Sequence, residues 1–148
     1  MSGEESVQFV DTNVLIYAYD RSAGEKHARA QALVADLWRV RRGCLSVQVL
    51  QEFYVVGARK LIEIEPADLH VILADLALWQ VHAPVATDVL GAVDLHERYQ
   101  VSFWDAMILQ SAARLGCAVV WSEDLNAGQE YQGVRVFNPF TTDQHLHQ

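Results

Sequence analysis

Phe9-Val10-Asp11-Thr12-Asn13-Val14-Leu15-Ile16-Tyr17 decides the fold of this chain. A short apolar run over 7–10 is long enough for a buried strand, and it stops at Asp11. Asp, Thr and Asn cap helix N-termini with a side-chain oxygen, so the pattern predicts a strand, a turn and a helix. In an open α/β sheet, ligands bind beyond the carboxyl ends of the strands. Asp11 is therefore either a simple helix cap or part of a binding site.

Length and composition bound the class of protein. The 148 residues, 51% hydrophobic and 20% charged, suit a single domain over 1–148, and we expect 1–6 and 141–148 to be frayed tails. Apolar stretches fall far short of the ~20 residues that span a bilayer. The segment 1–6 is acidic and polar, unlike a signal peptide. We therefore expect a cytoplasmic protein that does not engage a membrane.

The formal net charge of −8 argues against a protein that holds nucleic acid on a broad basic surface. It does not exclude an enzyme that reaches a phosphate through a metal ion, because cations would partly neutralise clustered acids. Five of the eleven basic residues lie in or just after one expected helix: Lys26, Arg29, Arg39, Arg41 and Arg42. They form either a solvated helix face or a patch for a phosphate backbone or an acidic partner.

The cysteines and two of the histidines suggest no metal site. Cys44 and Cys117 lack ligand spacing, so we expect neither a disulfide framework nor a zinc site. Both are expected to pack as small apolar residues. His82 and His96 also lack a partner at ligand spacing and are interpreted as structural or surface residues.

Short apolar runs alternate with segments of helical periodicity along the whole chain. The expected strands cover 7–10, 44–47, 81–85, 117–121 and 134–137, and the expected helices follow Asn13 and cover 25–41, 47–61, 67–79, 87–99 and 102–115. This alternation predicts a three-layer α/β/α fold with a central, mainly parallel sheet. Ser46 and Ser102 are expected to cap the helices that follow them, and Gly43 to close the helix before it.

Four acids share one expected edge of the sheet. Asp11 and Asp124 follow apolar strands, whereas Glu52 and Asp105 lie in the first turns of helices. Each has a simple structural interpretation as a cap or a solvated acid. Gathered at one edge, however, carboxylates repel one another and raise their pKa values, and a hard cation such as Mg²⁺ or Mn²⁺ removes that penalty.

The chain resembles the PIN-domain family, and within it the VapC-type toxin ribonucleases of toxin–antitoxin pairs. The segments that carry the resemblance are 9–15, 46–53, 103–106, 121–125 and 138–140, in this order. The resemblance implies a PIN-like fold and a metal-dependent endoribonuclease that hydrolyses RNA phosphodiester bonds with a metal-activated water. It assigns Asp11, Glu52, Asp105 and Asp124 as the catalytic acids that hold Mg²⁺ or Mn²⁺.

The same resemblance suggests supporting residues and partners. Asn13 and Ser122 are candidates for hydrogen bonds to the ligating carboxylates. Glu123 lies beside Asp124, and the sequence itself leaves the choice between them open, although the family match favours Asp124. The implied partners are an RNA substrate with unpaired bases, a small cognate antitoxin and a second copy of the chain in a homodimer.

Two other functions stay open. A phosphatase could use Asp11 as a covalent nucleophile, but Asn13 stands where the usual second Asp of that chemistry would be. Alternatively, the chain is a non-catalytic module that binds a partner, with the acids serving as caps and solubilising charge.

Overall fold

A computed structural model describes residues 6–141, and these contain a six-stranded sheet in the order β3-β2-β1-β4-β6-β5. The strands are β1 (Gln8–Val10), β2 (Gly43–Ser46), β3 (Gln80–His82), β4 (Val119–Trp121), β5 (Glu130–Tyr131) and β6 (Val134–Phe137). Only the β5–β6 pair is antiparallel, and the other four pairs are parallel. The predicted mainly parallel sheet is confirmed. Apart from Ser6 and Thr141, the tails expected at 1–6 and 141–148 lie outside the described residues.

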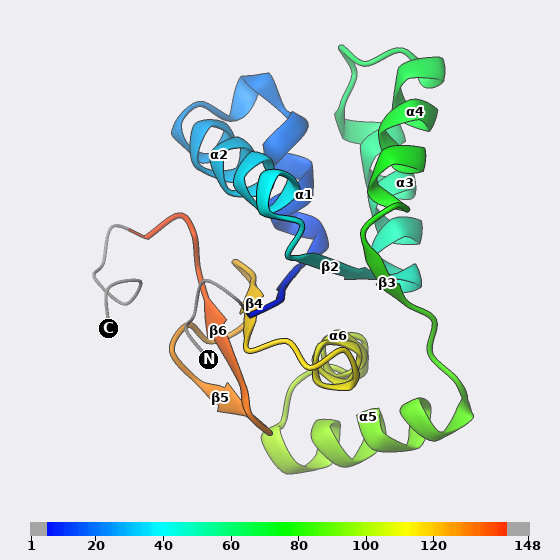
Figure 1. Ribbon diagram of the computed structural model, residues 1–148, viewed down its shortest axis with the longest axis vertical. Coiled ribbons are helices and arrows are strands. Elements are labelled where there is room, and N and C mark those ends of the chain that lie inside the picture. The colour runs from blue at the N-terminus through cyan, green and yellow to red at the C-terminus, as the bar shows by residue number, and fades with distance from the viewer. Residues whose placement is uncertain (1–5, 142–148) are drawn as a thin grey trace.

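Helices cover both faces of this sheet (Figure 1). They are α1 (Thr12–Tyr19), α2 (Glu25–Val40), α3 (Val47–Lys60), α4 (Pro66–Leu76), α5 (Ala86–Tyr99) and α6 (Phe103–Arg114), with a short 3-10 turn η2 (Arg21–Ala23) after α1. In Figure 1, α1 to α4 lie on one side of the sheet, and α5 and α6 lie on the other. The three-layer prediction is therefore confirmed.

Side-chain caps start the helices that carry the predicted acids. The Asp11 carboxylate accepts a hydrogen bond from Thr12 N at 2.7 Å and caps α1. Ser46 Oγ accepts from Val49 N at 3.3 Å, and Ser102 Oγ accepts from Asp105 N at 3.1 Å. Each cap satisfies a backbone N–H that has no partner within its helix.

The central strand β1 sets the position of Asp11. Val10 pairs with Trp121 of β4, and Asp11 N donates a hydrogen bond to Trp121 O at 2.9 Å. Because these neighbouring strands are parallel, the residues that follow them emerge at the same edge of the sheet. Asp11 and Ser122 therefore lie side by side although they are far apart in sequence.

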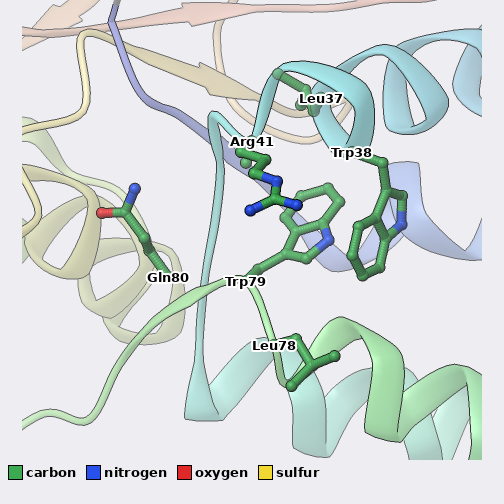
Figure 2. A pocket seen from close by; sticks show the side chains of 7 residues that line it. Leu37, Trp38, Arg41, Leu78, Trp79 and Gln80 are labelled. Atoms are coloured by element: carbon green, nitrogen blue, oxygen red, sulfur yellow. The ribbon is translucent and has the colours of Figure 1, made fainter.

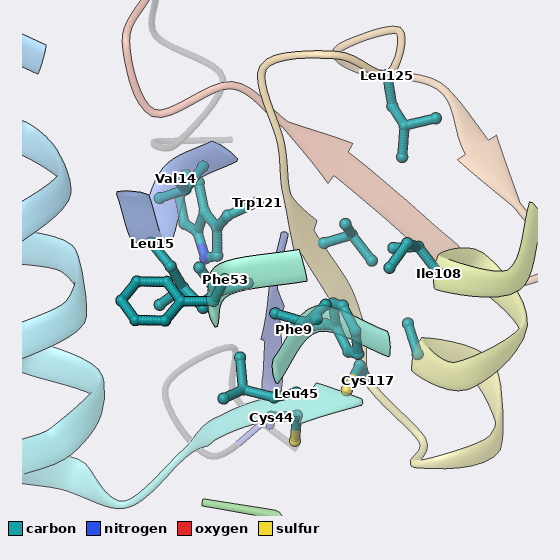
Figure 3. Packing of buried hydrophobic residues seen from close by; sticks show 14 of the residues in the cluster. Phe9, Val14, Leu15, Cys44, Leu45, Phe53, Ile108, Cys117, Trp121 and Leu125 are labelled. Carbon is teal, nitrogen blue, oxygen red and sulfur yellow. The ribbon is translucent and has the colours of Figure 1, made fainter. Parts of the chain in front are cut away.

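One core of buried apolar side chains surrounds β1 (Figure 3). Phe9, Leu45 and Phe53 are completely buried within it. Cys44 and Cys117 are free thiols inside the same core, so the prediction that they pack as small apolar residues is confirmed. In the part of the chain that the structure describes, we find no helix with the length and apolar character needed to cross a bilayer.

Several local predictions were wrong. Arg41, with φ of 58°, ends α2 in the left-handed conformation that we expected near Gly43. Gly43 instead begins β2, where an added Cβ would come within 2.2 Å of the Trp79 ring. The strand expected over 81–85 ends earlier, because β3 covers Gln80–His82. The short antiparallel strand β5 was not predicted, because two residues carry no detectable periodicity.

Candidate active site

The four predicted acids line one cavity of about 340 Å³ at the carboxyl edge of the parallel strands. Its wall comes from α1 and the residue before it, from α3 and from α6, together with Asp124 after β4. The lining consists of Asp11, Thr12, Asn13, Ile16, Tyr17, Asp20, Gln48, Glu52, Val56, Lys60, Trp104, Asp105, Ile108 and Asp124. The sheet topology thus brings together four side chains that are separated along the sequence.

Asp11 is the most buried of these acids, with 5% of its surface exposed. Its Oδ2 accepts hydrogen bonds from Ser122 Oγ at 2.8 Å and Asn13 Nδ2 at 3.3 Å. Burial raises the pKa of Asp11 to about 6, and the negative charges of Asp105 and Glu52 add to that shift against the hydrogen bonds from Ser122 and Thr12. Burying a carboxylate close to other acids costs folding free energy, and pKa values shifted in this way cluster at functional sites. The raised pKa therefore marks Asp11 as a candidate functional residue.

Glu52 and Asp105 face the same cavity from two different helices. Glu52 Oε1 accepts from Thr12 Oγ1 at 2.8 Å, and its Oε2 accepts from Gln48 Nε2 at 3.4 Å. Burial raises the pKa of Asp105, and the charges of Asp124 and Glu52 raise it further. The charges of Glu52 and Asp124 thus act on Asp105, as expected for carboxylates that line one cavity.

Asn13 and Ser122, the two candidates for supporting residues, form hydrogen bonds with Asp11 and Asp124. Asn13 Nδ2 donates to Asp11 Oδ2 and to Asp124 Oδ2, the latter at 3.1 Å. Ser122 Oγ donates to Asp11 Oδ2 and accepts from Asp124 N at 3.1 Å. Two polar side chains thereby set the positions of two carboxylates that come from different strands.

Glu123 takes a different position from its neighbour Asp124. Its side chain forms an ion pair with Lys26 of α2, whose ammonium lies 5.0 Å from the centre of the Tyr17 ring and 5.4 Å from that of Phe140. Glu123 does not line the cavity, whereas Asp124 does. The geometry therefore favours Asp124 over Glu123 as a member of the acidic cluster.

The donor set suits a hard divalent cation, because carboxylate oxygens are the ligands that Mg²⁺ and Mn²⁺ prefer. As placed, however, no three His, Cys, Asp or Glu side chains within 6–141 form a group that could hold one ion. Glu52 is held by Thr12, and Asp124 by Asn13. Side-chain rotation of these acids would be needed to bring their oxygens onto a common centre, and their partial exposure leaves room for it.

Sequence reasoning missed two donors to Glu52 and one ion pair next to the site. Thr12 and Gln48 both donate to Glu52. Gln48 precedes Glu52 by one helical turn, and this i, i+4 spacing is a signal that could have identified it. Lys26 was counted only among the basic residues of its helix, and no local pattern links it to Glu123, 97 residues away.

A second cavity, of about 460 Å³, lies at the opposite edge of the sheet (Figure 2). It is lined by Leu37, Trp38, Arg41, Gly43, Leu78, Trp79 and Gln80. Gly43 and Gln80 begin β2 and β3, so this cavity is at the amino edge of the strands. Its lining holds no acid, which makes it unsuited to bind a divalent cation.

Comparison with known proteins identifies the family. The PIN domain family model matches residues 9–129. Three solved structures share the fold at 20% sequence identity each. For the VapC20 toxin of Mycobacterium tuberculosis, which cleaves the sarcin-ricin loop, the TM-score is 0.60, with 79% of this chain and 91% of that chain covered.

For a toxin–antitoxin complex from Klebsiella pneumoniae, the TM-score is 0.66, with 91% of this chain and 98% of that chain covered. For a DNA-bound VapBC complex from Salmonella typhimurium, the TM-score is 0.59, with 90% of this chain and 98% of that chain covered. No curated protein matches the sequence significantly. Identity at this level shows the shared fold, and the family model covers most of the chain. The chain thus belongs to the PIN domain family and has the fold of VapC toxins.

Proposed function

We propose that this protein is a metal-dependent endoribonuclease that hydrolyses RNA phosphodiester bonds as the toxin of a toxin–antitoxin pair. The observation that carries the proposal is the convergence of Asp11, Glu52, Asp105 and Asp124 on one cavity. Membership of the PIN domain family and a fold shared with an RNA-cleaving toxin support it. We further propose that 1–148 is a single domain acting in the cytoplasm.

The four carboxylates are the residues that would hold Mg²⁺ or Mn²⁺. When bound, such an ion lowers the pKa of a water molecule and stabilises charge on phosphate oxygens. Asn13 and Ser122 would keep Asp11 and Asp124 oriented, and Thr12 and Gln48 would do the same for Glu52. These hydrogen bonds hold the carboxylates at the cavity before metal or substrate binds, and Glu52 and Asp124 would rotate from them to reach a common ion.

The phosphatase alternative is less well supported by the geometry. Asp11 is nearly buried, and its two oxygens accept hydrogen bonds from Thr12, Asn13 and Ser122. A carboxylate that attacks phosphorus needs one oxygen free in the cavity. The non-catalytic alternative is supported by one observation: within 6–141, no three acids are placed so that they could hold one metal ion. The cleavage assay distinguishes this alternative from the nuclease.

We also propose two protein partners. A small antitoxin would bind this chain, a partner supported by the toxin–antitoxin complexes that share its fold, and our proposal is that it lies across the acidic cavity. A homodimer would cover the apolar side chains that α3 and α4 expose, among which are Tyr54, Val55 and Val71. Sedimentation that finds only monomer at tens of micromolar, a concentration at which a weak dimer forms, would count against the homodimer.

The decisive experiment measures cleavage of RNA by the purified protein with Mg²⁺ or Mn²⁺ and with EDTA. Cleavage should require the metal and should be lost in Asp11→Asn. Asp36→Asn is the matched control, because Asp36 lies on the exposed side of α2 and pairs with Arg39. Metal-dependent cleavage that is equal in wild type and Asp11→Asn would overturn the assignment of this site.

A further inference from the structure

Trp104 is an exposed aromatic residue at the rim of the acidic cavity. It is 63% exposed, although the next four helical positions after Asp105 are buried in the core. Its ring makes an edge contact with Phe103 at 5.1 Å between centroids and has no other aromatic partner in the described chain. The indole therefore contributes little to the packing of the fold, while it lines the cavity directly beside Asp105.

The backbone beside this indole is tied to the acidic cluster. Gln48 Nε2 donates to Trp104 O at 3.2 Å and also contacts Glu52 Oε2 at 3.4 Å. Trp104 thus has a defined position relative to Glu52 through a single amide side chain. This hydrogen bond fixes the Trp104 backbone and not its ring, and an exposed aromatic ring at the cavity rim is suited to contact a ligand there.

The cavity extends from Trp104 along α3. Gln48, Glu52, Val56 and Lys60 follow one another at intervals of four residues and all line it, as expected for one face of a helix. From Gln48 to Lys60 the helix rises by about 18 Å. The side of the cavity that this face of α3 forms is thus long enough for a short run of nucleotides rather than a single small molecule.

Lys60 lies at the far end of this face and is the one basic residue among the described residues that line the cavity. It is exposed and forms no ion pair within residues 6–141, whereas Lys26 is occupied by Glu123. In a protein with a net charge of −8, an unpaired cation beside four acids is available to a phosphate group.

We propose that an unpaired RNA segment lies along α3, with one base stacked on Trp104 and a phosphate contacted by Lys60. This inference rests on the proposed ribonuclease function and names two residues, Trp104 and Lys60, that contact its substrate outside the acidic cluster. An indole stacks on any base, because every base has a π-face. A base within a duplex does not expose that face, so single-stranded or looped RNA is the ligand that fits.

The test is binding of a fluorescein-labelled single-stranded RNA of mixed sequence, about 12 nucleotides long. Fluorescence anisotropy in EDTA at low salt measures binding without metal-dependent cleavage. Trp104→Ala should weaken binding by a factor of roughly 5 to 150, the range that base–aromatic stacking supports. Trp104→Phe should restore most of it. Ile62→Ala, which removes an exposed apolar side chain outside the cavity, should leave binding unchanged.

Lys60→Gln should weaken binding and reduce its salt dependence, since one phosphate contact is lost. Arg59→Gln removes the same charge from the neighbouring residue, which does not line the cavity, and should have a smaller effect. A duplex of the same sequence should bind more weakly and should not respond to Trp104→Ala. Circular dichroism of each variant checks that the fold is retained.

The outcomes separate this inference from the nuclease proposal. If wild type and Trp104→Ala bind and cut single-stranded RNA equally, the inference is overturned while the nuclease stands. If the wild type binds no RNA, the inference also fails. If RNA binding depends on Trp104 but no cleavage occurs in Mg²⁺ or Mn²⁺, the proposed RNA-binding site along α3 is supported and the ribonuclease proposal is overturned.

Discussion

Lys26 of α2 forms an ion pair with Glu123, and this contact separates Glu123 from Asp124, the acid that follows it in sequence. Asp124 instead accepts a hydrogen bond from Asn13, which also contacts Asp11. Two adjacent carboxylates thus have different partners and different environments. The first prediction follows from this difference.

Asp124→Asn should reduce the rate of RNA cleavage by about 100-fold or more, because it removes a proposed metal ligand. Glu123→Gln should reduce it only a few-fold. The ion pair of Glu123 is partly exposed, so its loss should change the free energy of unfolding by less than about 1 kcal/mol. Initial cleavage rates and urea denaturation of both variants measure these effects. Equal losses of activity in the two variants would contradict the assignment.

Asn13→Ala and Ser122→Ala should each weaken Mn²⁺ binding by about 10- to 100-fold, because residues that orient ligands contribute that much to metal affinity. Asn13 contacts both Asp11 and Asp124 and should show the larger loss. Titration calorimetry with Mn²⁺ measures the affinity. Asn126→Ala is the control, since Asn126 is exposed and contacts Gln129 instead. Unchanged affinity in both site variants would refute the supporting role.

Asp11→Asn should stabilise the metal-free protein at neutral pH. The folded protein raises the pKa of Asp11 from 3.8 to about 6, so between these values the folded state binds more protons than the unfolded state. The free energy of unfolding therefore falls as pH rises through this window and stays lower above it. One pKa unit corresponds to about 1.4 kcal/mol, and since Asn loses part of the hydrogen bonding, we expect a gain of about 1 to 2 kcal/mol.

Denaturation in EDTA at neutral pH and near pH 4 tests this prediction through linkage. The advantage of Asp11→Asn over wild type should shrink at the lower pH, where Asp11 is already protonated. Added Mn²⁺ should stabilise wild type and not the variant. A variant that is less stable than wild type at neutral pH in EDTA would show that burial of the charge is not the dominant effect.

Asp88 should show the opposite pH dependence. Asp88 lies in α5 and is fully buried against α6. The hydrogen bond from Val85 N lowers its pKa most, and Gln110, Arg114 and the nearby His82 lower it further. Asp88 therefore stabilises the fold above the ordinary carboxyl pKa, and this contribution is lost as pH falls through the lowered value. Asp88→Asn should lower the melting temperature at neutral pH, because it leaves Arg114 without its partner.

The difference from wild type should disappear toward acid pH, and metal binding should be retained because Asp88 does not line the acidic cavity. Asp94→Asn on the exposed side of α5 is the matched control and should melt like wild type. His82 also contacts Ser111 Oγ at 2.9 Å, which supports its interpretation as a structural residue. A melting temperature unchanged by Asp88→Asn would refute the role of this network.

The sequence by itself determined the layer architecture and the edge at which the acids meet. Short strands that alternate with helices must form a parallel sheet, because a crossover helix returns the chain to the same edge. Asp11 and Asp124 follow strand ends and Glu52 lies in the helix after β2, so local patterns place these three acids at that edge. Asp105 lies in α6, which follows α5 and not a strand, so its place at the edge also depends on how α5 packs. The helix caps Ser46 and Ser102 could be predicted from the sequence because capping also depends on local patterns.

Only the tertiary structure decided which side chains contact one another. The pairing of Lys26 with Glu123, the packing of Trp79 on Gly43 and the exposure of Trp104 depend on residues that are far apart in sequence or on neighbouring helices. Such contacts are set by packing and side-chain rotation, which leave no periodic signal in the chain. Local sequence therefore places three of the carboxylates at one edge, and long-range packing selects Asp124 over Glu123.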